Sequence, residues 1–187
     1  MTTKDIVFAL AATLCVASAH AQTPSQPGAS FMKVFAGLCM RGIGDLEALR
    51  SELKTKGLPT LQEAAARVFL DGRPGDAWPV PEAGALGNLV LILPSDQYEC
   101  SVLARRGAAT PTQAEFSQLL TKPPVPFASE LKTDERPSSA LNGEIHTLGY
   151  LWKLDGNPKA LAFMLTTSES PAASIQLKAT ATRVSAP

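Results

Sequence analysis

Few side chains in this sequence are of the types that carry out chemistry, and histidine is the scarcest of them. The 187 residues include only His20 and His146, and His20 lies in a segment that we expect to be removed. One histidine cannot form a paired-histidine metal site, and no ligand spacing joins His146 to carboxylates. As a catalytic base it would need an orienting carboxylate and a nucleophile, and the chain has no Gly-x-Ser-x-Gly elbow. We therefore predict no catalytic residue, no metal and no cofactor, and we interpret His146 as a structural strand residue.

A second motif of catalytic type is Ser51-Glu52-Leu53-Lys54, which matches the Ser-x-x-Lys signature of penicillin-binding enzymes. Those enzymes also need a Lys-Thr-Gly strand elsewhere in a longer chain. Here Lys54-Thr55-Lys56-Gly57 overlaps the first motif. We interpret the match as chance.

Cysteine is the remaining reactive type. Cys15 would leave with the removed segment, so Cys39 and Cys100 form an even pair. Such a pair becomes a disulfide in an oxidising compartment. We predict a bond between Cys39 and Cys100 that closes a loop of about 62 residues and contributes about 4 kcal/mol in the chain-entropy model. A nucleophilic thiol is the alternative.

Residues 1–21 have the pattern of a cleavable export signal. Lys4 gives a positive start, residues 6–19 form an apolar run, and Ala19 and Ala21 place small residues before Gln22. The run is shorter than the roughly 20 apolar residues that a membrane-spanning helix needs. We predict cleavage after Ala21, a periplasmic or secreted location and no permanent membrane anchor.

Composition limits the partners of the mature chain. Removal of 21 residues from the 187 leaves 166, the size of one ordinary domain. Loss of Lys4 and Asp5 from 17 basic and 17 acidic side chains leaves 16 of each, so the net charge stays at zero. A neutral surface offers no general attraction for phosphate backbones or anionic lipids, and we predict no nucleic-acid partner.

Hydrophobic spacing and turn signals divide the mature chain into helices and strands. Helices are predicted from Phe31, over 45–57, over 60–72 and from Thr110, with Asp45, Thr60 and Thr110 as capping residues. The Thr110 cap is paired with Gln113. The predicted strands cover residues 89–93, 98–105, 144–154, 160–167 and 174–184, with a short edge strand around Trp78.

These elements predict a single α+β domain over residues 30–187, after a flexible N-terminal arm at 22–29. Its N-terminal helices pack on one face of a mainly antiparallel sheet of about five to six strands. Residues 122–143 contain four prolines and mixed charge. We predict that they form a long, disordered loop.

Two groups of residues are candidates for binding a partner. Trp78 lies on a connection that also carries Arg73 and Asp76, and an aromatic beside opposite charges is typical of interface hot spots. Burial of Trp78 as a core plug is the alternative, which its size favours. Arg105 and Arg106 end a predicted strand and would bind a carboxylate, or would simply face solvent.

Taken in order, four segments resemble a family of exported proteobacterial proteins with no assigned activity. They are Cys39, Gly44–Arg50, Cys100–Arg106 and Phe163–Ser168. The resemblance spans most of the mature chain. It implies a location in the cell envelope and brings no catalytic residue with it.

The functional expectation is a periplasmic, non-enzymatic binding module, of inhibitor or immunity type, whose partner is another envelope protein. It rests on a small, disulfide-braced, neutral domain with two connections able to present an interface. Two alternatives remain open. One is a small envelope hydrolase that uses His146, and the other is an envelope assembly or structural factor.

Overall fold

The computed structural model describes residues 27–82 and 84–186. The predicted export signal at 1–21 and residues 22–26 of the predicted arm lie outside them. The first helix begins at Pro27, three residues earlier than the predicted domain boundary. Within the described ranges, no helix is long and apolar enough to cross a membrane.

The helices of the described chain are short and are mostly placed where the sequence predicts them. Asp45 caps the second α-helix, as predicted, because its side chain accepts a hydrogen bond of 2.9 Å from the Ala48 amide. The third helix begins at Glu63 rather than at a Thr60 cap, and its N-cap Gln62 makes no side-chain bond. The helices are α1 (Pro27–Val34), the π-helix η1 (Phe35–Met40), α2 (Leu46–Thr55), α3 (Glu63–Phe69) and α4 (Ala109–Leu120).

The strands form one antiparallel sheet in the order β1-β2-β3-β8-β7-β6-β4, with β5 paired to β6. The longest pairings in the sheet join β6 to β7 and β7 to β8, and β8 also pairs with β3. The strands are β1 (Gly75–Glu82), β2 (Ala85–Pro94), β3 (Glu99–Ala104), β4 (Ala128–Glu135), β5 (Ser138–Ser139), β6 (Gly143–Lys153), β7 (Lys159–Ser168) and β8 (Leu177–Ser185).

The predicted α+β class is confirmed, but two finer expectations were wrong. The sheet has eight strands rather than five or six, because β4 and β5 lie inside the segment 122–143 that we expected to be a disordered loop. The helices are not all N-terminal, since α4 lies between β3 and β4 in the chain.

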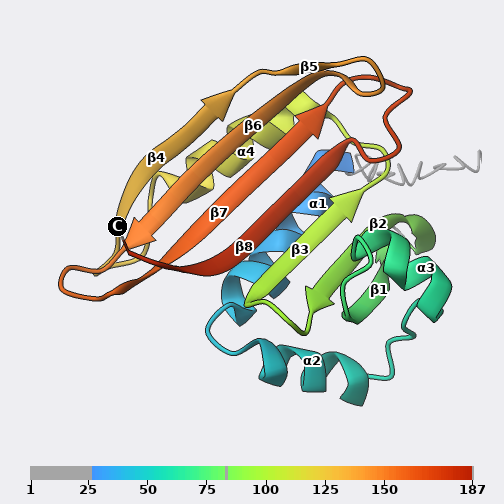
Figure 1. Cartoon of the computed structure of the whole chain (residues 1–187), viewed down its shortest axis with the longest axis horizontal. Coiled ribbons are helices and arrows are strands. Elements are labelled where there is room, and N and C mark those ends of the chain that lie inside the picture. Colours follow the sequence, from blue (N-terminus) through green and yellow to red (C-terminus); the bar gives the residue numbers. More distant parts are fainter. Residues whose placement is uncertain (1–26, 83, 187) are drawn as a thin grey trace, which may run out of the picture.

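The sheet has a covered face and a partly open face (Figure 1). Helices α1 and α4 lie behind the sheet in this view, with η1 and α2 contributing to the same apolar layer. Helix α3 packs on the other face, but only over β1, β2 and β3, where Ala66 and Leu70 meet a small second cluster. The main core is built from alternate residues of every long strand, among them Leu91, Val102, Tyr150, Phe163 and Ala179.

The predicted disulfide is confirmed and joins the helical layer to the sheet. Cys39 of η1 and Cys100 of β3 have an S–S distance of 1.98 Å and a Cα–Cα distance of 5.2 Å. Both residues are fully buried in the main core. The bond therefore fastens the N-terminal helices to the third strand of the sheet.

Candidate functional site

The predicted binding residue Trp78 is part of the core. Its side chain is 1% exposed, and its strand position faces Leu91 of β2 in register. The indole Nε1 is also buried and has no hydrogen-bond partner among the described residues. A partner protein cannot reach this side chain, so the core role that its size favours is the one the structure shows.

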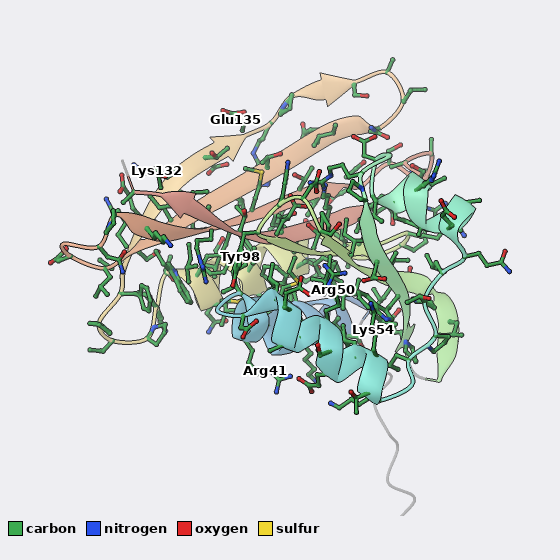
Figure 2. The ribbon with its side chains drawn as sticks, turned by 60° about the horizontal axis from the view of Figure 1, so that its bottom comes forward. Arg41, Arg50, Lys54, Tyr98, Lys132 and Glu135 are labelled. Carbon is green, nitrogen blue, oxygen red and sulfur yellow. A yellow bond between two sulfur atoms is a disulfide. The ribbon has the colours of Figure 1, made fainter. Side chains whose placement is uncertain are left out.

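Asp76, the second residue of that predicted group, is used inside the protein. It forms an ion pair with Arg50 of α2, whose side chain is 10% exposed, and a second one of 3.4 Å with Lys54. Arg50 also donates to the carbonyl oxygens of Leu93 and Pro94, both at 3.3 Å. Figure 2 shows Arg50 and Lys54 along the same helix. The pair fixes α2 to the edge of the sheet.

Arg73, the third residue of the group, lies where the cover provided by α3 ends. It donates to Gln97 at 2.7 Å and to Glu99 at 3.1 Å. The hydrogen bond with Glu99 raises the pKa of the Arg73 guanidinium. Ser101 continues the network, because its hydroxyl lies 3.1 Å from Glu99 and 2.7 Å from Thr180 of β8. Arg73 is therefore a charged residue at the border of the sheet surface that α3 leaves uncovered.

Arg105 and Arg106 are exposed after the end of β3, as their sequence position suggests. Arg106 donates to the carbonyl oxygen of Ala173 at 2.9 Å. Arg105 and Arg106 lie at one end of β3 and Arg73 lies at the other. β3 has six residues and spans about 20 Å. The structure does not bring the predicted binding residues together in one site.

A different surface stands out on the sheet, and we call it the open face. It is the face of β4, β6, β7 and β8 that is turned away from α1 and α4 (Figure 1). Its central cross-strand row joins Thr180, Met164, Gly149 and Thr133 in register. The neighbouring row on β7 and β8 pairs Ala162 with Thr182. In these two rows the side chains are small apart from Met164.

The open face is hollowed around Met164. Residues of the open face line a pocket of about 340 Å³, which has Arg73 and Glu99 at one end and Lys132 at the other. Met164 is 47% exposed, and its neighbours on β7, Phe163 and Leu165, point to the opposite face, where they are buried. Gly149 beside it has no side chain to fill the space, and a Cβ there would lie 3.0 Å from the Cβ of Thr133. A large apolar side chain thus stands exposed in a shallow cavity.

The rim of the open face carries more positive than negative charge. Lys178 is exposed and, within the described part of the chain, has no carboxylate within ion-pair distance. Lys132 comes from β4, as Figure 2 shows, and pairs with Glu130. Lys153 pairs with the same carboxylate. The pKa of Glu130 is lowered to about 2, chiefly by the hydrogen bond from Lys132 and next by the one from Lys153.

His146 occupies a separate site at the other end of β6. Its side chain is buried, and Nε2 lies 2.7 Å from Oδ1 of Asp134 on β4. It lines a pocket of about 380 Å³, which we call the His146 pocket. A hydrolase would require a nucleophile at the second ring nitrogen, but no described hydroxyl is hydrogen-bonded to Nδ1. Likewise, no group of three potential metal ligands occurs among the described side chains.

Sequence reasoning missed the residues that shape both sites. Met164, Gly149 and Lys178 belong to strands that were predicted, but their exposure depends on which face the helices cover. The outward positions of β8 gave a partial signal, since Lys178, Thr180 and Thr182 alternate with buried residues. Asp134 was missed because its strand was expected to be a loop.

Comparisons with protein-family models, with curated proteins and with solved structures find no match to this chain. Over the described residues the fold and its surfaces therefore define the class directly: an α+β protein with a helical layer on one face of the sheet, α3 over part of the other face, and an internal disulfide. The resemblance to exported proteobacterial proteins stays a prediction.

Proposed function

We propose that this protein is an exported, periplasmic binding module without enzymatic activity, of inhibitor or immunity type, which contacts another envelope protein through its open face. The observation that carries the proposal is the exposure of Met164 in the middle of a sheet. Helices α1, η1, α2 and α4 pack against one face, whereas only α3 packs on the other, at its β1–β3 end. Methionine adapts its shape to a partner surface and is over-used where proteins bind others.

The chemistry of the rim indicates what the partner presents. Three cationic side chains, Arg73, Lys132 and Lys178, and one anionic side chain, Glu99, line the hollow. Arg73 and Lys132 already have carboxylate partners, which leaves Lys178 as the available charge. Electrostatic complementarity then favours an apolar side chain that enters beside Met164 and is flanked by acidic residues. This is the partner surface that we propose.

The edges of the sheet support contact through the face rather than by addition of a strand. β1 carries Pro79 and Pro81, which cannot donate to a neighbouring strand. β4 has a bulge between Leu131 and Thr133, next to Lys132, and is rich in charged residues. Prolines, charges and bulges are the devices that keep edges from pairing with other chains. Both edges are therefore poorly suited to pairing with a partner strand, which leaves the open face as the surface for contact.

The test combines capture with site-specific cross-linking. A photo-reactive amino acid is placed at position 164 of the mature protein, and the cross-linked envelope protein is identified from periplasmic and membrane extracts. The same label at Val68, which is 77% exposed on α3, is the control for random contact. We expect a product from position 164 that position 68 does not give.

Affinity measurements with the purified partner then test the face itself. Met164→Glu should weaken binding at least tenfold, because it places a carboxylate opposite the acidic residues proposed for the partner, in a site that must lose water. Lys178→Glu should weaken it as well and should flatten the salt dependence. Val68→Glu and Lys159→Glu are the matched controls. Full affinity of Met164→Glu, with unchanged melting of the variant, would contradict the proposed surface.

A further inference from the structure

One cross-strand row of the open face carries a charge at each of its two ends. The row runs from Lys178 on β8 through Thr166 on β7 and Thr147 on β6 to Glu135 on β4, each in register with the next. Lys178 and Glu135 are exposed, and neither forms an ion pair within the described part of the chain. Three strand spacings separate them by about 14 Å, too far for them to pair within one molecule.

The position of Glu135 on the open face follows from its neighbours on β4. Asp134 is hydrogen-bonded to His146, which lines a pocket with residues of α4 and so lies on the helical side of the sheet. Because side chains alternate along a strand, Glu135 and Thr133 point to the other side. Figure 2 shows Glu135 on the same strand as Lys132. The anion and the cation of the row therefore face the same way.

The next row has the shape of a knob beside a hole. Met164 of β7 is 47% exposed, and its partner in register on β6 is Gly149, which has no side chain. Consider a two-fold axis that runs parallel to the strands, midway between β6 and β7. It places Met164 of one molecule over Gly149 of a second molecule, and the reverse. Such mutual complementarity is what a symmetric dimer interface requires.

The same axis also matches the rows on either side. It places Lys178 of each molecule opposite Glu135 of the other, so two opposite-charge contacts form together. In the third row Ala162 of β7 is in register with Leu151 of β6, and the axis sets the small side chain of one molecule against the larger one of the other. One operation therefore matches charge and shape in three neighbouring rows.

Helix α3 leaves room for a second molecule. It packs only over β1, β2 and β3, to one side of the four open strands (Figure 1). Beyond β4, on the other side, the main sheet ends. The two-fold axis carries α3 of the second molecule past this free edge, so neither α3 lies between the faces. The two sheets can then stack at about 10 Å, the ordinary spacing of packed sheets.

We infer that the open face binds the open face of a second copy of this chain about this axis, and so covers the surface proposed for the envelope partner. The inference rests on the proposed function in taking the open face as a protein-binding surface. The second copy presents what the rim favours, an apolar Met164 close to the carboxylate of Glu135. Four strands provide a flat area of about 400 Å² per molecule, about half of that in a standard interface, so the dimer is weak and reversible.

Sedimentation equilibrium of the purified mature protein tests the pairing without any envelope partner. From about 1 µM to about 1 mM protein, we expect a reversible change from monomer to dimer. Lys178→Glu and Glu135→Lys should each weaken dimer formation at least tenfold, because each brings like charges together at both symmetric contacts. An equimolar mixture of the two variants should form a mixed dimer with the affinity of the wild type, since each contact then joins a cation to an anion.

Matched controls carry the same charge changes on the helical side of the sheet. Lys159 is an even number of positions from the buried Phe163, and Glu144 from the buried His146, so both lie on that side. Lys159→Glu and Glu144→Lys should leave the dimer unchanged. A protein that stays monomeric throughout would overturn the inference. So would a dimer that neither Lys178→Glu nor Glu135→Lys weakens, or a mixture of these two variants that stays monomeric.

The proposed function is tested separately by the cross-linking from position 164. A dimer of the purified protein without any cross-linked envelope protein would support this inference and contradict the proposed function. A cross-linked envelope protein together with a monomeric purified protein would do the opposite. If both form, the purified partner should dissociate the dimer, because the two compete for one face. Binding of the partner to an intact dimer would overturn the inference.

Discussion

Arg50 and Asp76 form an ion pair that ties α2 to β1 across a gap of 26 residues in sequence. The Arg50 side chain is 10% exposed, whereas Asp76 keeps 25% of its surface. Because two backbone carbonyls at the end of β2 also accept from Arg50, the guanidinium is held from several sides. Asp76, which the sequence suggested as a binding residue, thus acts within the fold.

Removal of Asp76 should be costly because it leaves Arg50 buried without its main counter-charge. We expect Asp76→Ala to lower the free energy of unfolding by about 2 kcal/mol, less than for a fully buried pair because Asp76 is partly exposed. Glu52→Gln is the matched control, since Glu52 pairs with Arg41 and Lys56 on the surface. It should cost much less than Asp76→Ala, because ion pairs between exposed side chains contribute little. Urea unfolding measures both, and equal costs would refute the structural role assigned to Asp76.

Trp78 gives a second prediction, in which two substitutions should differ. Trp78→Ala opens a large cavity in the core and should cost about 3–5 kcal/mol. Trp78→Phe keeps most of the ring and removes an indole N–H that has no acceptor among the described residues, so we expect a cost of only about 1–2 kcal/mol. Chemical denaturation compares the two. An equal cost would mean that the N–H contributes a bond.

The fold was predictable where burial gives a strand or helix a regular spacing of apolar residues. β2, β6, β7 and β8 show continuous or alternating apolar residues, and the cysteine pair was predicted from its number and expected compartment. β4 was missed because an edge strand with few apolar residues carries no such pattern. Its place in the sheet comes from pairing with β6, which is a long-range property.

The sites were less predictable for a related reason. Thr110 and Gln113 were assigned to a helix cap from their spacing, but Thr110 instead donates to Glu169 and Gln113 donates to Thr167 at 2.6 Å. Both contacts join residues more than 50 positions apart. Similarly, the exposure of Met164 depends on which face α3 leaves uncovered. Contacts between residues so far apart in the sequence cannot be predicted from a local sequence pattern.

Acid should weaken one surface cluster on β4. The pKa of Glu130 is lowered from its ordinary value of 4.5 to about 2, chiefly by hydrogen bonds from Lys132 and Lys153. A carboxyl group with a lowered pKa stabilises the folded state above its unfolded pKa and loses that contribution as the pH falls through the folded pKa. The stabilising effect of Glu130 should therefore be constant above pH 5 and disappear between about pH 4.5 and 2.

The comparison of wild type with Glu130→Gln isolates this effect. Their difference in unfolding free energy should shrink over that pH interval and should also shrink in high salt, because the Glu130 side chain is 40% exposed and its ion pairs are screened. Carbon NMR of the Glu130 carboxyl group measures the titration directly. A midpoint near 4.5 would show that the lysines do not hold the carboxylate in solution.

The disulfide should contribute more to stability than any surface contact, because it closes a loop between positions 61 residues apart. Loop-closure entropy predicts a contribution of about 4 kcal/mol. The double variant Cys39→Ala and Cys100→Ala should lower the free energy of unfolding by this amount plus a smaller loss of packing, since both sulfurs are buried. Alanine avoids the buried hydroxyl that serine would introduce. Wild type measured under reducing conditions should match the variant to within the packing loss. Unfolding curves that coincide with and without reductant would show that the bond does not brace the fold, and η1 would then be held to β3 by apolar packing alone.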